Sequence, residues 1–388
     1  MPCDVQQKES CLFPWTHMYF HTNQKVYPCC KLVEHPNFEL GNTTDSIEEL
    51  WNSPVMKNLR LSFINKQEPR ECLSNCFKNI NPLYVHVPES FKLLQADFFN
   101  KTLADGSYDK NFIYWNVNES NVCNFACVYC CSSYSTKFDS KLKKSFSSLE
   151  DQLLLFKENA KNLRMISLSA GESHLQPGYY KMLEYLKETG LTHIPINVHS
   201  NMSGYMLGKQ NFYELLNHFS DVTLYGSLDS YGERAEFIRH GTIWKDIEVN
   251  RQKLFEYPNI KFVAQSVISN LNLWSLPDFH YDWFSKGFLG KHNVHYYVLD
   301  TPDYLHISVM NDRVKQHVKE KLKDYISFLE EVTDKTYNQV TPQFKIHQIL
   351  QELEKEPKTS LGHFNMFTLK QSIKTKINFN RIFPEFKI

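Results

Sequence analysis

Residues 121–130 read Asn-Val-Cys-Asn-Phe-Ala-Cys-Val-Tyr-Cys, which puts three cysteines at positions 123, 127 and 130. The segment follows a strand-like run at residues 112–118, so we predict a loop at the carboxyl end of that strand. Three thiolates this close together can bind one iron–sulfur cube and leave one of its irons without a protein ligand. The alternative is a zinc site completed by a fourth ligand, such as Cys131 or a histidine.

From residue 112 onward, strand-like runs alternate with helix-like runs. Strands are predicted at residues 112–118, 165–169, 194–199, 222–227, 260–267 and 294–299, and helices at 149–163, 178–188, 212–218, 243–255 and 276–285. This alternation indicates parallel strands with right-handed crossovers, in either an open doubly wound sheet or an incomplete barrel. In both architectures, the chemistry gathers at the carboxyl ends of the strands.

Polar segments follow the second, third and fourth predicted strands. They read Ala170-Gly171-Glu172-Ser173, Ser200-Asn201-Met202 and Ser227-Leu228-Asp229-Ser230. A strand end with an unhindered backbone and a carboxylate, as at residues 171–172, suits an ammonium group. Arg234 and Arg239 follow the last segment, and an arginine at either position can pair with a carboxylate. We therefore expect these segments to line a site beside the cysteines.

The spacing Cys123-x3-Cys127-x2-Cys130, with Tyr129 before the last cysteine, resembles the signature of radical S-adenosylmethionine (SAM) enzymes. The resemblance covers about residues 113–300, because the polar segments occur in the family's order on the expected elements. It implies that the three cysteines hold a [4Fe–4S] cluster whose open iron binds the methionine amino and carboxylate groups of SAM. One electron then cleaves SAM to methionine and a 5′-deoxyadenosyl radical, which abstracts a hydrogen atom from the substrate.

The resemblance also implies which residues receive SAM. Residues 170–173 correspond to the family's Gly-Gly-Glu-Pro, with the first glycine and the proline replaced. Ala170, Gly171 and Glu172 would therefore receive the methionine amino group. Ser200 and Asn201 correspond to the family's Thr-Asn-Gly, whose third residue is replaced here.

Further SAM contacts are implied beyond the fourth strand. Ser227 and Asp229 belong to a segment that resembles the family's Ser-Leu-Asp-Gly, and Ser227 would touch the ribose or the carboxylate of SAM. Arg239 would pair with the carboxylate, with Arg234 as the rival for that role. Tyr129 is expected to contact the adenine, as is the fifth strand near residues 263–267.

Further cysteines lie near the N-terminus, around a predicted hairpin in which residues 18–21 and 25–27 flank the turn. Four thiolates spread over this hairpin and a later helix end could form a closed, fully ligated site. The stretch resembles the auxiliary-cluster modules called SPASM and, in shorter form, twitch, although Gln24 replaces the usual hairpin glycine. The resemblance implies an auxiliary [4Fe–4S] cluster on Cys11, Cys29, Cys72 and Cys76, with Cys30 competing with Cys29 as a ligand. Structural zinc on the same four residues is the alternative.

A helix is predicted to begin after this hairpin, with Ser46 as its N-cap and Glu49 at the capping-box position. The fold class predicted for the whole chain is α/β, a partial (β/α)6 radical SAM barrel with a small cysteine-rich α+β module before it and a helical segment after it. The predicted divisions are an auxiliary-cluster domain at 1–85, a linker helix at 86–111, a radical SAM core at 112–300 and a helical extension at 301–388.

Composition narrows the class of protein and its partners. The 388 residues carry 43 basic and 43 acidic side chains, so no overall basic field attracts nucleic acid or an anionic membrane. No apolar run approaches the roughly 20 residues that span a bilayer, and the first residues lack the pattern of a secretory signal. Ten cysteines in two clusters indicate metal binding more than disulfides. We expect a cytoplasmic protein.

The main hypothesis is a radical SAM enzyme that modifies a peptide or protein, with an auxiliary cluster that assists electron transfer. A flavodoxin or ferredoxin-type protein is the expected electron donor. One alternative is radical chemistry on a small molecule such as a sugar, a nucleotide or an amino acid. The other is a binding protein that uses zinc or relays electrons and has no enzymatic activity.

Overall fold

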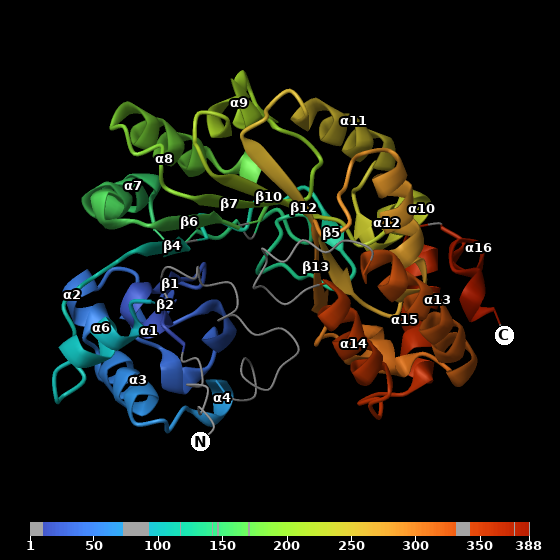
Figure 1. Ribbon diagram of the computed structural model, residues 1–388, viewed down its shortest axis with the longest axis horizontal. Helices are drawn as coiled ribbons and strands as arrows, with labels where there is room; N and C mark the ends of the chain where they lie inside the picture. Colours follow the sequence, from blue (N-terminus) through green and yellow to red (C-terminus); the bar gives the residue numbers. More distant parts are fainter. Residues whose placement is uncertain are drawn as a thin grey trace. The chain divides into compact units, whose positions relative to one another are not determined.

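The computed structural model gives two compact units, residues 1–119 with 144–167 and residues 120–143 with 168–388 (Figure 1). The structure describes residues 11–72, 93–116, 118–141, 143–145, 147–169, 171–330, 342–375 and 377–387. Two of the predicted site residues, Cys76 and Ala170, lie outside this described part.

The first unit contains a small antiparallel sheet with the order β1-β2-β3 and several short helices. Its elements are α1 (Phe13–Thr16), β1 (Tyr19–Phe20), β2 (Lys25–Tyr27), β3 (Gly41–Asn42), α2 (Ile47–Trp51), α3 (Pro54–Ile64), α4 (Arg70–Cys72), α6 (Gln95–Lys101), β4 (Tyr114–Asn116) and α7 (Leu149–Asn159). The predicted hairpin is confirmed, since Tyr19 pairs with Tyr27. The predicted capping box is also confirmed, because the Glu49 backbone N–H donates to Ser46 Oγ at 3.2 Å.

Arg60 is fully buried at the centre of this unit and holds three segments together. Its Nε donates to the carbonyl of Pro14 at 2.9 Å, and its Nη2 donates to the carbonyl of Trp51 at 2.8 Å. Its Nη1 donates to the side-chain oxygen of Asn52 at 2.9 Å. A buried guanidinium is costly unless its donors are satisfied, and here backbone oxygens satisfy most of them.

The main sheet has six strands in the order β13-β12-β10-β7-β6-β4. The strands after β4 are β6 (Met165–Leu168), β7 (Ile196–Ser200), β10 (Val222–Ser227), β12 (Ile260–Ile268) and β13 (Val294–Val298). The pairs β4–β6, β7–β10, β10–β12 and β12–β13 are parallel. A doubly wound sheet reverses its strand order at a switch point, whereas this order follows the sequence throughout. The fold is therefore the partial (β/α)6 barrel.

Helices between the strands complete each crossover. They are α7, whose bounds are given above, between β4 and β6, followed by α8 (Pro177–Glu188), α9 (Phe212–Leu216), α10 (Gly232–Ile238), α11 (Trp244–Leu254) and α12 (Leu276–Ser285). Helices α8, α9 and α11 lie on the same side of β7, β10 and β12 (Figure 1). Strand β10 alternates buried and half-buried residues, as expected when one sheet face is covered and the other is more open.

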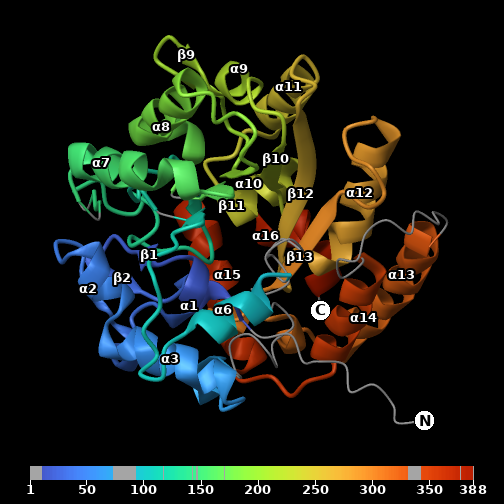
Figure 2. The same ribbon diagram turned by 60° about the vertical axis from the view of Figure 1, so that its left-hand side comes forward.

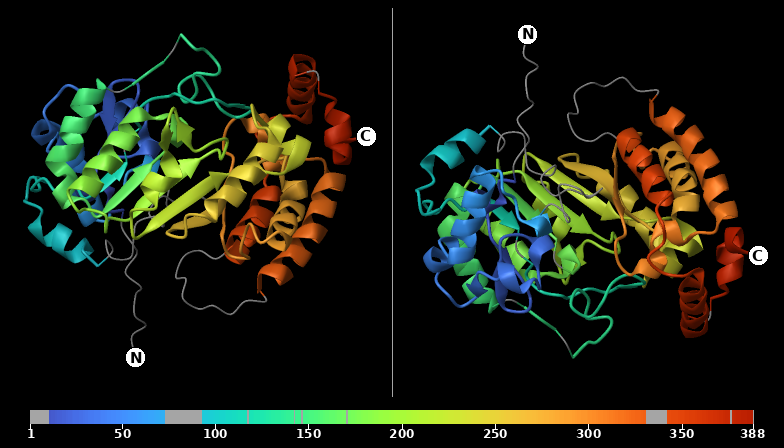
Figure 3. Two further views of the ribbon diagram at one scale, coloured as in Figure 1. Left: turned by 90° about the horizontal axis from the view of Figure 1, so that it is seen from above. Right: turned by 90° about the horizontal axis from the view of Figure 1, so that it is seen from below.

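The part that follows β13 is helical, as predicted. Its helices are α13 (Asp312–Glu330), α14 (Pro342–Leu353), α15 (Leu361–Thr375) and α16 (Phe379–Ile382). Helices α13 and α14 contact each other, and α14 contacts β13 (Figures 2 and 3). Phe364 of α15, Phe379 of α16 and Phe383, which follows α16, belong to one buried cluster with Phe237 of α10. No helix in the described ranges is both long enough and apolar enough to cross a membrane.

Candidate functional site

The cysteine loop at residues 121–131 is shaped by main-chain hydrogen bonds. Cys127 lies in β5 (Ala126–Cys127), which pairs antiparallel with β11 (Arg239–His240), and Arg239 stands opposite Cys127. The backbone N–H of Val128 donates to the Ile238 carbonyl at 2.9 Å, and that of Cys130 donates to the Cys127 carbonyl at 3.0 Å. The loop therefore has a fixed course next to the segment that carries Arg239.

The four cysteines of this loop, including the three candidate ligands Cys123, Cys127 and Cys130, are thiols and form no disulfide. Cys127 is buried, and burial raises the pKa of its thiol to about 12 and that of Cys130 to about 11. Iron binds thiolates, so cluster assembly must release these protons. Phe125 already donates a backbone N–H to the Cys123 sulfur at 3.5 Å. Three thiols on one shaped loop suit a cluster with one open iron. Among the described residues, no three histidine, cysteine or acidic side chains are grouped so that they could hold a single metal ion.

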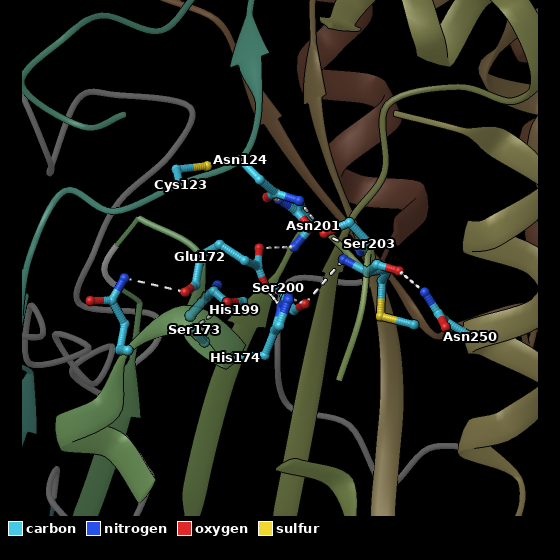
Figure 4. A network of polar contacts seen from close by, with 12 residues as sticks. Cys123, Asn124, Glu172, Ser173, His174, His199, Ser200, Asn201, Ser203 and Asn250 are labelled. Atoms are coloured by element: carbon cyan, nitrogen blue, oxygen red, sulfur yellow. Dashed lines mark hydrogen bonds and ion pairs between the residues drawn. The ribbon is translucent and has the colours of Figure 1, made fainter. Parts of the chain in front are cut away.

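Glu172 lies at the centre of a buried polar network at the ends of β6 and β7 (Figure 4). Its Oε1 accepts the Ser200 hydroxyl at 2.7 Å and lies 2.9 Å from His174 Nδ1. Its Oε2 accepts the backbone N–H of Asn201 at 2.6 Å. A carboxylate offers about four lone-pair sites, and these three contacts leave room for one more donor.

Gly171 allows this network to lie directly against the cysteine loop. Its φ of +44° is in the left-handed region, and a Cβ there would stand 2.2 Å from the carbonyl oxygen of Val122. The next residue, Glu172, donates its backbone N–H to that same oxygen at 2.9 Å. Only glycine combines this backbone conformation with so close an approach.

The turn after β7 is tied to the cysteine loop by amide side chains (Figure 4). Asn201 Nδ2 donates to Asn124 Oδ1 at 2.9 Å, and Asn124 Nδ2 donates to Ser203 Oγ at 2.8 Å. Met202 takes a φ of +63°, which explains the glycine that the family carries at this position. Asn250 of α11 donates to the Met202 carbonyl at 2.8 Å and holds the turn.

Asp229 and Arg239 form a buried ion pair at the end of β10. Arg239 Nε donates to Asp229 Oδ2 at 2.9 Å, and Nη2 donates to Oδ1 at 3.1 Å. The Tyr129 hydroxyl also donates to Oδ2, at 2.5 Å. Arg234 instead pairs with Glu385 at 2.5 Å, so Arg239 is the arginine that stands next to the cysteine loop.

The structure thus brings most of the predicted SAM-site residues to one edge of the sheet. Ser227 ends β10, where it pairs with Gln265 of β12, and Asp229 follows two residues later in the chain. Sequence reasoning did not single out Asn124 or Asn250. The only available signal for Asn124 was its position between two cysteines, and nothing in the sequence marked Asn250 as the partner of a turn 48 residues away.

A row of rings lies on the half-buried face of the sheet, below the strand ends. His199 stacks on Tyr225 with ring centroids 5.0 Å apart, and Tyr225 stacks on His295 at 5.9 Å. His199 Nδ1 also lies 2.8 Å from Gln265 Oε1. Burial lowers the pKa of His199, and it lowers that of His295 to about 4, so both rings are neutral at pH 7. We call His199, Tyr225 and His295 the ring row.

The N-terminal cysteines are only partly within the described residues. Cys29 is buried and directly precedes the short 3-10 helix that begins at Cys30. Cys72 ends α4, and Cys11 precedes α1. Gln24 has a φ of +66°, so the hairpin does use the left-handed conformation for which the family carries glycine.

Family models match two parts of this chain. Residues 11–77 match the SPASM iron–sulfur cluster-binding domain, and residues 117–257 match the radical SAM superfamily. No curated protein matches the chain.

Solved structures with a similar fold include anSMEcpe with bound AdoMet and the Kp18Cys peptide. It is 15% identical with a TM-score of 0.41, over 56% of this chain and 59% of that chain. SuiB of Streptococcus suis bound to the precursor peptide SuiA is 17% identical with a TM-score of 0.40, over 62% of this chain and 52% of that chain. The present chain thus spans about three-fifths or less of the length of these proteins.

Proposed function

Because this chain joins a radical SAM domain to a SPASM iron–sulfur cluster-binding domain, we propose that it uses SAM-derived radical chemistry to modify a side chain of a peptide or protein. The observation that carries the proposal is the convergence of the Cys123, Cys127 and Cys130 loop with the Glu172 network at one edge of the barrel. The proposed domain division stays at residues 1–85, 86–111, 112–300 and 301–388.

The radical SAM domain implies a [4Fe–4S] cluster that binds SAM, and the SPASM domain implies auxiliary iron–sulfur binding. When bound, the cluster supplies the electron that splits SAM into methionine and a 5′-deoxyadenosyl radical. We assign this cluster to Cys123, Cys127 and Cys130, and the auxiliary cluster to Cys11, Cys29, Cys72 and Cys76. A flavodoxin or ferredoxin-type protein is the proposed electron donor.

The remaining lone-pair site of Glu172 would accept the ammonium group of SAM. Ser200 and Asn201 hold the carboxylate in place for this contact, at 2.7 and 2.6 Å. A preorganised acceptor costs no reorientation when the ligand arrives, which favours a single pose of the methionine moiety. Because Gly171 has no side chain, the turn that carries Glu172 can lie against the cysteine loop, where SAM would bind.

The ring row is the proposed contact surface for the substrate. Tyr225 of the ring row precedes Ser227 by two residues on β10, which corresponds to roughly 7 Å along the strand. Neutral rings and the amide of Gln265 suit an uncharged polar or aromatic side chain, because they offer stacking and hydrogen bonds without a net charge. The same surface would suit a sugar or another small molecule, which keeps that alternative as the second candidate.

The test begins with anaerobic purification and cluster reconstitution. Two clusters predict a brown protein with about eight iron atoms per chain, and reduction with dithionite should give an electron paramagnetic resonance signal that changes when SAM is added. Release of 5′-deoxyadenosine shows cleavage of SAM. Stimulation of that release by peptides alone supports the main proposal, and stimulation by sugars, nucleotides or free amino acids alone supports the second candidate. A colourless protein with about two zinc ions would contradict both.

A further inference from the structure

We propose that Arg239, which Asp229 holds in place as a positioning residue, directs a guanidinium N–H at the sulfur of Cys127 and thereby raises the reduction potential of the cluster bound there. This inference rests on the proposed function, since it assumes the cluster on Cys123, Cys127 and Cys130. It differs from the role first expected for Arg239, which was to pair with the carboxylate of SAM.

The direction of the guanidinium follows from how its donors are used. Asp229 takes the Nε and Nη2 donors of Arg239 at 2.9 and 3.1 Å, which fixes the plane of the group. The Nη1 nitrogen then lies 3.9 Å from the Cys127 sulfur. Arg239 also stands opposite Cys127 in the β5–β11 pair. The backbone pairing and the side-chain contacts therefore both keep Arg239 next to Cys127.

Asp229 is itself held in place on both oxygens. Its Oδ1 accepts the backbone N–H of Val267 at 2.8 Å, and its Oδ2 accepts the Tyr129 hydroxyl. Asp229 and Arg239 are only 1% and 9% exposed, so solvent and salt screen their charges weakly. Three residues from three segments (Tyr129, Asp229 and Val267) therefore fix a single positive group next to a sulfur that we assign to the cluster.

The sign of the effect follows from electrostatics. Reduction adds one negative charge to the cluster, and a nearby N–H donor with positive charge stabilises the reduced state more than the oxidised state. Hydrogen bonds to ligand sulfurs are among the features that set iron–sulfur potentials. Asp229 has the opposite charge and partly offsets Arg239. Removal of the arginine should thus lower the potential. Asp229→Asn removes the offsetting negative charge but keeps a side-chain oxygen that can accept from Arg239, so it should raise the potential.

The experiment is a redox titration of the full-length reconstituted protein, without SAM, followed by electron paramagnetic resonance. The relevant signal is the one that is lost in Cys127→Ala. At the wild-type midpoint, Arg239→Met should lower the ratio of reduced to oxidised cluster about tenfold, which is a shift of 59 mV for one electron. Asp229→Asn should raise the ratio. Arg234→Met is the control and should leave it unchanged, because Arg234 is engaged with Glu385.

An unchanged midpoint in Arg239→Met with full iron content would overturn the inference. So would shifts of the same sign in Arg239→Met and Asp229→Asn, which would indicate a general disturbance of the loop. If Arg239→Met loses iron, Arg239→Lys is measured instead. It keeps the charge but loses the fork, so a smaller shift of the same sign is expected, and an unshifted midpoint overturns the inference. Absence of a cluster or of SAM cleavage in the wild type would defeat the proposed function itself.

Discussion

Replacement of Gly171 by alanine tests the contact between the Glu172 turn and the cysteine loop. The new Cβ would stand 2.2 Å from the Val122 carbonyl oxygen, more than an ångström closer than ordinary contact. The left-handed φ of +44° alone costs alanine about 1 kcal/mol. The steric clash adds about 1–3 kcal/mol, as overpacking of a tight site does. A matching shift of the loop by about 1 Å would lower the rate of SAM cleavage roughly 100-fold.

Gly190→Ala is the matched control for this substitution. Gly190 has a φ of +75°, but a Cβ added there would meet no atom within 4 Å. It therefore carries the backbone strain without the clash. We expect Gly171→Ala to unfold roughly 2–6 °C below Gly190→Ala in a thermal melt, and to retain less iron after reconstitution. Equal melting temperatures and equal iron contents in the two variants would refute the proposed close approach.

Four other outcomes are expected. Cys127→Ala should abolish 5′-deoxyadenosine release, whereas Cys131→Ala should retain it, and loss in both would contradict the three-ligand assignment. Cys72→Ala should leave SAM cleavage without substrate intact but lose the product, as measured by mass spectrometry; normal product formation would rule out an auxiliary role. Iron uptake by the apoprotein should accelerate between pH 7 and pH 8.5. Burial raises the pKa of Cys127 to about 12, and below that pKa the thiolate fraction increases about tenfold for each pH unit. An uptake rate that is independent of pH would contradict this expectation. Met202→Gly should relieve about 1 kcal/mol of backbone strain but lose the packing of a fully buried side chain. The net result expected in urea unfolding is a destabilisation of about 1–3 kcal/mol. A more stable variant would show that strain outweighs packing.

Local patterns in the sequence predicted most of the fold. The alternation of strands and helices is confirmed, and the capping box of Ser46 and Glu49 forms as expected. Hydrophobic periodicity and capping depend on residues only a few positions apart, so they can be read directly. The alternation alone left a barrel and a doubly wound sheet open. The family resemblance predicted the partial (β/α)6 barrel, and the strand order confirms it.

The sequence singled out the candidate cysteines of the site but not the hydrogen bonds that connect its segments. The cysteine spacing singled out residues 123, 127 and 130, but not the bond between Asn124 and Asn201, which lie 77 residues apart. The family resemblance paired Arg239 with the carboxylate of SAM, and the sequence analysis did not identify the contact between Arg239 and Asp229. The left-handed turn at Met202 contradicts the usual preference of methionine, so only the structure could reveal it.

The cysteine loop owes its course to bonds that need no iron. Val128, Cys130 and Asn124 are all held by main-chain or amide partners. We therefore expect the cysteine loop to keep its conformation when oxygen destroys the cluster, so that a new cluster can assemble on the same thiols. Damage of this kind would be repairable by fresh iron and sulfide, with no need to unfold the chain or make it again.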